Sequence, residues 1–144
     1  MRVGLLLLLL LFMLCEPALA DSSCTSVERA ASRKAILTEM RTFVRKMSGL
    51  EVKFVVRHLG VDCKWAWIET EPQSADGKRR YEPVNALLAR RNGRWRYVES
   101  PPEWAICEED PDCADRARYF QKLAARHPGL SSVIFPQVET SSLR

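Results

Sequence analysis

The chain opens with a short apolar run that determines where the rest of it has to fold. Residues 5–15 are uninterruptedly apolar, Arg2 precedes them, and the small residues Ala18 and Ala20 follow. This order is typical of a cleaved secretory signal, and the run is too short for a membrane-spanning helix, which takes about 20 residues. We therefore predict that residues 1–20 form a signal peptide cleaved after Ala20. The mature chain should fold in the periplasm or outside the cell, without a stable membrane anchor.

Cysteine usage then constrains the fold, because an exported chain can staple a small domain with disulfides. Four of the five cysteines remain after cleavage, and four cysteines allow three pairings. The short spacing between Cys107 and Cys113 favours local closure, which would leave Cys24 to pair with Cys63. No zinc site is expected, since no two cysteines stand in C-x2-4-C spacing and the chain has only two histidines.

The mature chain has the length of one domain. Without the signal it comprises 124 residues, and single domains cluster at roughly 100–150 residues. We expect one domain over residues 21–136 and a loose tail over 137–144. The net charge is +4, but its distribution is uneven: seven bases and one acid lie between positions 78 and 96, and seven acids and no base between 99 and 115. The surface should therefore be electrically bipolar.

Periodic apolar residues predict a helix near the start of the mature chain. Thr25 and Glu28 have the T-x-x-E spacing of a capping box, and Gly49 stands where a C-terminal glycine would stop the helix. Between them an apolar stripe repeats at helical spacing and should face the core. Its members are Ile36, Leu37, Met40, Phe43, Val44 and Met47.

From residue 50 the apolar period changes to two, which indicates a half-buried strand. A second strand is expected over residues 63–70, with Pro72 ending it. The segment from Pro72 to Pro83 is longer than an ordinary hairpin loop and is a candidate binding loop. In the first strand the inward face should hold Leu50, Val52, Phe54 and Val56, continued by His58.

The Asn92-Gly93 dipeptide predicts a hairpin, because both residues take positive φ at low cost and favour a two-residue type I′ turn. A second helix is expected over residues 113–126, stopped by His127-Pro128-Gly129. Residues 133–135 should add a short strand or plug an edge of the core. The expected hairpin register pairs Arg91 with Arg94, Arg90 with Trp95, Leu88 with Tyr97 and Leu87 with Val98.

The basic residues indicate a candidate binding surface. Arginine forks match carboxylate and phosphate groups, and aromatic rings add stacking; the alternative is a merely solvated basic face. The partner of an exported chain would be another exported protein or an anionic envelope component, such as a glycan or a lipid head group, and not nucleic acid. The candidate binding residues are Lys78, Arg79, Arg80, Arg90, Arg91, Arg94, Trp95 and Arg96.

Catalytic signatures are weak, and neither a cofactor nor a metal site is predicted. The weak catalytic candidates are His58, Glu69 and Tyr97, and for His58 a structural role is preferred because buried polar groups normally find a partner. Glu69 and Glu71 share a strand face and could form a carboxylate pair there; the alternative is that they are ordinary acids at the end of a strand. The acidic segment 108–112 lacks the alternation of an EF-hand, so calcium binding is left open.

Six short patterns carry a resemblance: R-K-x-I-L at 33–37, F-V-V at 54–56, W-A-W at 65–67, Pro72, D-G at 76–77 and A-L-L-x-R-x-x-G-R-W-R at 86–96. Together they resemble a group of small exported bacterial proteins of unknown function. Such proteins look like cystatin- or NTF2-like α+β rolls. The resemblance therefore implies an α+β fold in which a curved antiparallel sheet cradles the N-terminal helix. It implies no activity.

These observations favour an exported, non-enzymatic binding module, such as an inhibitor or an immunity-type protein, with the C-terminal helix and the disulfides completing the domain. Bipolar charge and arginines beside aromatic residues support this reading, since such residues anchor interfaces. The alternative is a small NTF2-like enzyme or ligand carrier that uses the mouth of the roll.

Overall fold

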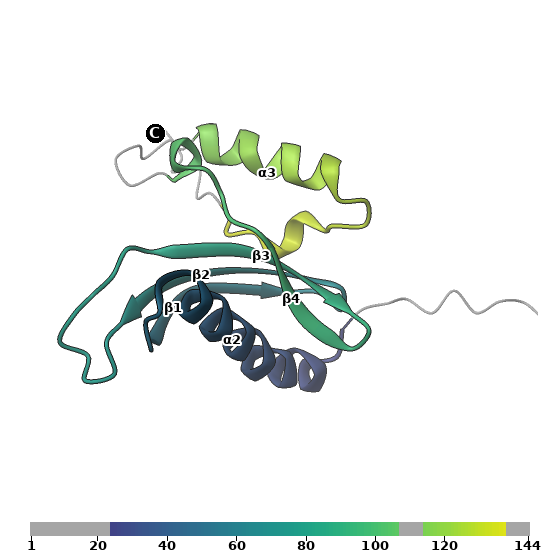
Figure 1. Ribbon diagram of the computed structural model, residues 1–144. Coiled ribbons are helices and arrows are strands. Elements are labelled where there is room, and N and C mark those ends of the chain that lie inside the picture. The colour runs from purple at the N-terminus through teal and green to yellow at the C-terminus, as the bar shows by residue number, and fades with distance from the viewer. Residues whose placement is uncertain (1–23, 107–113, 138–144) are drawn as a thin grey trace, which may run out of the picture.

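The chain folds as an α+β domain, seen in a computed structural model that describes residues 24–106 and 114–137 (Figure 1). A helix precedes a four-stranded antiparallel sheet, and a second helix follows it, as the sequence predicts. Among the described residues, no helix is long and apolar enough to cross a membrane. The elements are α2 (Ser26–Ser48), β1 (Lys53–Val61), β2 (Trp65–Gln73), β3 (Val84–Arg91), β4 (Arg94–Glu99), η2 (Glu103–Ala105), α3 (Ala114–Arg126) and η3 (Ser132–Ile134).

Helix α2 begins and ends where its capping residues predict. The Thr25 hydroxyl accepts a hydrogen bond from the backbone N–H of Glu28, whose carboxylate accepts in turn from the backbone N–H of Thr25. Gly49 adopts φ 71° and closes the C-terminus. Met47 departs from the predicted stripe: it lies in the last turn of α2 and is 71% exposed.

The strands follow the order β1-β2-β3-β4, with each strand antiparallel to its neighbour. Helix α2 lies on one face of this sheet and α3 on the other, so the domain has three layers (Figure 1). The central strands are therefore buried on both faces: Trp67 and Ile68 are consecutive in β2, point to opposite faces, and are both buried. The second face is covered by α3 and the segment after it, and the apolar pattern of a strand cannot predict contacts with residues so distant in sequence.

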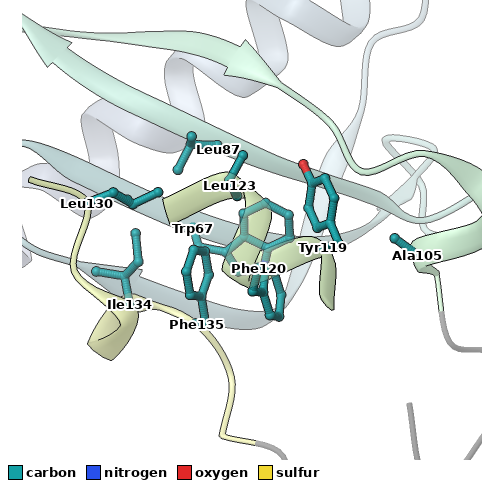
Figure 2. Packing of buried hydrophobic residues seen from close by; sticks show 9 residues of the cluster. All are labelled: Trp67, Leu87, Ala105, Tyr119, Phe120, Leu123, Leu130, Ile134 and Phe135. Atoms are coloured by element: carbon teal, nitrogen blue, oxygen red, sulfur yellow. The ribbon is translucent and has the colours of Figure 1, made fainter. Parts of the chain in front are cut away.

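The face under α3 is packed with aromatic rings (Figure 2). The Trp67 ring meets Phe120 edge-on at 5.0 Å and Phe135 at 5.7 Å, while Phe120 and Phe135 are stacked at 4.2 Å. Such pairs add roughly 0.5–1.5 kcal/mol each beyond the burial of their area. Ile134 and Phe135 thus plug this core together with Leu130, which agrees with one of the two predictions for residues 133–135, although Val133 itself is 71% exposed.

The C-terminal segment lies directly against β1. A side chain on Gly60 would collide with the backbone of Ile134, so glycine is what allows this close approach. The imidazole Nε2 of His58 lies 2.8 Å from the Ile134 carbonyl oxygen. A ring with a proton on Nε2 donates this bond to the carbonyl, and a partly buried polar contact of this kind suits a structural role for His58.

A disulfide joins Cys24, just before α2, to Cys63 in the β1–β2 turn, as predicted. The proposed pair Cys107 and Cys113 lies outside the described residues, and so do the predicted signal peptide, the acidic segment 108–112 and nearly all of the predicted tail.

Strand β2 runs through Pro72 to Gln73, whereas the sequence predicted an end at Pro72. The carbonyl of Pro72 accepts from the backbone N–H of Tyr81 at 2.9 Å. Since N–H and C=O of one strand residue point the same way, the imide nitrogen of Pro72 also faces away from β1 and interrupts no bond to it. Pairing with β3 ends earlier, at Thr70 and Val84.

Candidate functional site

The β3–β4 turn gathers the first group of candidate residues. Asn92 and Gly93 adopt φ 50° and 75°, which confirms the type I′ turn. The register pairs Arg91 with Arg94 and Arg90 with Trp95, as predicted. The exception is Leu87, which pairs with Glu99 and not with Val98, because the register shifts between Leu87 and Leu88.

Four exposed bases lie together at this end of the sheet. The carbonyl of Lys64 accepts the backbone N–H of Arg90 at 2.7 Å, which places the β1–β2 turn beside the hairpin. The disulfide at Cys63 fixes the start of α2 at the same end. We call this group the hairpin end; it comprises Lys64, Arg90, Arg91 and Arg94.

The positive charges of the hairpin end are not balanced by carboxylates of neighbouring described residues. Elsewhere in the described residues, several bases, among them Lys78, Arg79 and Arg80, likewise form no ion pair, while six arginines each pair with a carboxylate. None of the four bases of the hairpin end does so within that part of the chain, although the charge of Arg90 acts on Glu28. The pKa of the Glu28 carboxyl is lowered by its hydrogen bonds from Thr25 and, to a smaller extent, by Arg90. The hairpin end therefore presents bases whose donors are open to an external anion.

The predicted continuous basic surface is divided into two separate parts. Lys78, Arg79 and Arg80 belong to the β2–β3 loop, which lies at the opposite end of the sheet from the β3–β4 turn (Figure 1). Strand β3 separates them with eight residues, which correspond to roughly 25 Å at a rise of about 3.3 Å per residue. One compact ligand cannot contact both groups.

The β2–β3 loop is also more ordered than a free binding loop. The Ser74 backbone N–H donates to the Arg79 carbonyl, and Gly77 N–H donates to the Ser74 carbonyl, at 2.9 and 2.8 Å. Asp76 accepts from the Ser74 hydroxyl and from the Lys78 N–H, and these bonds lower the pKa of the Asp76 carboxyl. The loop is thus a closed turn built on polar bonds.

Two further predicted binding residues do not belong to an open basic surface. Trp95 is 5% exposed and packs under α2, so the expected surface aromatic is a core residue. Arg96 lies 3.5 Å from Glu39 of α2 and forms an ion pair with it. The alternation of β4 explains the first difference: with α2 on that face, an inward tryptophan is buried.

A β-bulge in β1 redirects two polar side chains. The register shifts between Val56, which pairs with Thr70, and His58, which pairs with Glu69. Two residues of β1 then oppose one of β2, so His58 turns to the α3 face and meets Ile134. The prediction that His58 continues the inward face of Val56 is therefore wrong, because a bulge breaks the period of two.

The two glutamates of β2 do not form a carboxylate pair with each other. Glu71 accepts two hydrogen bonds from Arg57, at 2.7 and 2.8 Å, and this guanidinium lowers the pKa of the Glu71 carboxyl. Glu69 accepts from Arg116 of α3 and, at 2.9 Å, from the indole N–H of Trp67. Each carboxylate is thus neutralised separately.

These two ion pairs line a pocket of about 250 Å³ on the α3 face, at the end where β2 meets the β2–β3 loop. We call it the polar pocket. Its inner pair is the more enclosed, with side chains 16% and 26% exposed for Glu69 and Arg116. Its lining comprises Arg57, Glu69, Thr70, Glu71, Pro83, Asn85, Ala105, Ile106 and Arg116.

The third weak catalytic candidate does not reach this pocket. Tyr97 stacks on Phe43 of α2, with ring centroids 3.9 Å apart, and its hydroxyl donates to Ser100. It therefore lies on the α2 face, opposite Glu69 and His58. The structure does not bring His58, Glu69 and Tyr97 together as a catalytic group.

The buried hydroxyl of Tyr119 was not predicted from the sequence. The hydroxyl of Tyr119 in α3 is buried and finds no hydrogen-bond partner among the described residues. Burial, aided by the negative charge of Glu99, raises the pKa of Tyr119 to about 12. Glu99 itself accepts from both Arg126 and His127, so these three side chains tie the end of β4 to the end of α3.

A metal site is not supported by the closest set of ligand atoms. Cys24, Glu28 and Cys63 have donor atoms within 4.8 Å of one another. The two sulfurs are bonded to each other in the disulfide, so neither is a thiolate, and thiolate is the form of cysteine that binds metal.

Comparison of the chain with models of protein families, with curated proteins and with solved structures gives no match.

Proposed function

We propose that the mature chain is an exported, non-enzymatic binding module that engages an acidic partner through the hairpin end. The observation that carries the proposal is the set of four exposed bases, Lys64, Arg90, Arg91 and Arg94, that lack carboxylate partners within the described residues. Some bases elsewhere in that part of the chain are also unpaired, but at the hairpin end they gather around one tight turn, whose central residues are Asn92 and Gly93. Unpaired arginines held on a tight hairpin bind carboxylates at a low cost in conformational entropy.

Export of the chain belongs to the same proposal. The apolar leader with its small residues before position 21 supports it, and so does the Cys24–Cys63 disulfide, since such bonds persist in oxidising compartments. In the periplasm or outside the cell, the partner is another exported protein with an acidic surface, and the module acts as an inhibitor or an immunity-type protein. An anionic envelope component is the other source of the same charge.

The fold type proposed is the cystatin- or NTF2-like roll. An N-terminal helix packed on one face of a four-stranded antiparallel sheet supports this assignment, as does the resemblance of residues 33–98 to small exported bacterial proteins. Helix α3 on the second face is an addition to that plan. It buries a face that would otherwise be available for docking, which favours the ends of the sheet as binding surfaces.

The test is a charge reversal at the hairpin end. The oxidised mature protein is used to capture its partner from periplasmic extract, and the triple variant Arg90→Glu, Arg91→Glu, Arg94→Glu is compared with it. The matched control, Lys78→Glu, Arg79→Glu, Arg80→Glu, makes the same change of charge at the opposite end of the sheet. Both variants are first checked for an unchanged denaturation midpoint.

We expect the hairpin variant to lose the partner, while the control retains it. At low salt the association rate of the hairpin variant should fall at least about tenfold. Equal losses in both variants would show that net charge alone drives capture. Retention of the same partner by the hairpin variant would overturn the proposal.

A further inference from the structure

We infer that the polar pocket binds a small zwitterion that carries both a carboxylate and an ammonium group, the chemistry of a free amino acid. The inference concerns the end of the sheet opposite the hairpin end and does not depend on the function proposed above.

Charge balance in the polar pocket selects a ligand with both signs. Two arginines and two glutamates line it, so their formal charges cancel. A lone anion bound to the free donors of Arg57 would give this neutral pocket a net negative charge, and an uncompensated charge in an enclosed site is costly. A lone cation bound to Glu69 would give it a net positive charge. A zwitterion brings one charge of each sign and leaves the pocket neutral.

Both kinds of polar partner remain available in the pocket. Arg57 uses its Nε and one Nη2 hydrogen for Glu71, which leaves three of its five N–H donors. Both donors to Glu69, Trp67 and Arg116, contact Oε1, and no described residue donates to Oε2. The carboxylate of a ligand would take the free donors of Arg57, and its ammonium would take Oε2 of Glu69.

The backbone around the pocket is shaped to present these groups. Arg57 occupies the extra position of the β1 bulge, and bulges re-aim side chains at functional sites. Arg116 lies over the Phe120 ring, at 5.5 Å from its centroid, so the aromatic core holds it in place. Both arginines are therefore preorganised, which lowers the entropic cost of binding a ligand.

The size and the remaining walls fit a ligand as small as an amino acid. The pocket volume of about 250 Å³ lies below the roughly 300–1,000 Å³ of sites for drug-sized molecules. Pro83 and Ile106 provide apolar contact for a side chain, and the Asn85 amide adds one more donor and acceptor.

Trp67 provides a direct readout, because its indole N–H donates to Glu69 at 2.9 Å. The chain has four tryptophans, so a heteronuclear NMR spectrum of the oxidised mature protein has four indole signals. Glu69→Gln identifies the Trp67 signal by shifting it. The protein is then titrated separately with glycine, L-leucine, L-glutamate and L-lysine, with acetate and methylamine as single-charge probes, and with glucose as a neutral polar probe.

We expect at least one amino acid to shift the Trp67 signal saturably, with half-saturation at millimolar concentration or below, while acetate, methylamine and glucose do not. Arg57→Gln and Glu69→Gln should each weaken this binding about tenfold or more. Glu39→Gln, which removes the partner of Arg96 on α2, is the matched control and should leave it unchanged.

Arg57 is more than half exposed, so its substitution tests the pocket without unfolding the domain, and the other three indole signals report on the fold. No shift with any amino acid would overturn the inference. So would an equal shift with acetate, preferential binding of glucose, or unchanged binding in both pocket variants.

Discussion

Replacing Cys24 and Cys63 together by serine removes the bond that joins the start of α2 to the β1–β2 turn. The two cysteines are 39 residues apart in the sequence, and the loop between them contains all of α2 and β1. In the chain-entropy relation, a cross-link over a loop of this length restrains the unfolded chain by about 4 kcal/mol at 25 °C. We therefore expect the double variant to lose about 4 kcal/mol of its free energy of unfolding.

The assay is equilibrium unfolding of the mature chain in guanidinium chloride, followed by tryptophan fluorescence. The midpoint should fall, and the slope with denaturant should rise, because the unfolded variant is no longer cross-linked and exposes more surface. Cys107 and Cys113 stay unchanged in both proteins, so the comparison isolates one disulfide, and the double substitution leaves no odd thiol. The two serines are small and polar, which suits the partly exposed site of Cys24 and Cys63.

A loss of less than about 1 kcal/mol would refute the entropic reasoning, because it would mean that the unfolded chain gains little freedom when the loop opens. A loss far above about 5 kcal/mol would refute it in the other direction. In that case the bond would be supporting native contacts of the hairpin end as well as restraining the unfolded chain.

Three further predictions concern single residues. Tyr119→Phe removes a buried hydroxyl without a described partner and should raise the free energy of unfolding by about 1 kcal/mol; a clear loss of stability would reveal a partner. Gly60→Ala adds a methyl group that clashes with the backbone of Ile134 and should lower the free energy of unfolding by about 2 kcal/mol. Hydrogen exchange in residues 130–135 should become faster, and unchanged exchange there would contradict this prediction. The pKa of Glu71 is lowered by Arg57, so its contribution to stability is present above its unfolded pKa of about 4.3 and is lost as the pH falls through the lower folded pKa. Glu71→Gln should reduce the fall in stability between about pH 4.3 and pH 2, measured by denaturant unfolding at each pH, and an unchanged pH dependence would count against the Arg57–Glu71 pair.

Local rules predicted the parts of the fold that depend on a few adjacent residues. The capping box at Thr25 and Glu28 fixed the start of α2, and Gly49 fixed its end. The Asn92-Gly93 turn set the register of four predicted pairs, of which the three nearest the turn were correct. These features involve backbone conformations that only a few residue types favour, and they hold wherever the rest of the chain packs.

The candidate site was harder to predict, because it depends on contacts between distant segments. The β1 bulge changes which face His58 occupies, and no glycine or other local signal marks it. Basic residues close together in the sequence were expected to form one surface, yet strand β3 carries the chain from one end of the sheet to the other between Arg80 and Arg91. Proximity in sequence was therefore a poor guide to proximity in space.

The polar pocket shows why alternation along one strand is ambiguous. Trp67, Glu69 and Glu71 occupy successive outward positions of β2, on the face that α3 covers, and by pattern alone two glutamates at a strand end indicate solvent. What makes them a pocket is Arg116, which lies one turn before Phe120 in α3 and reaches Glu69 while resting over the aromatic core. The same helix thus closes the apolar core over Trp67 and supplies charge to the neighbouring position. Because the core fixes α3, the enclosed ion pair is held in place by aromatic packing, and any change to that packing will be transmitted to the pocket.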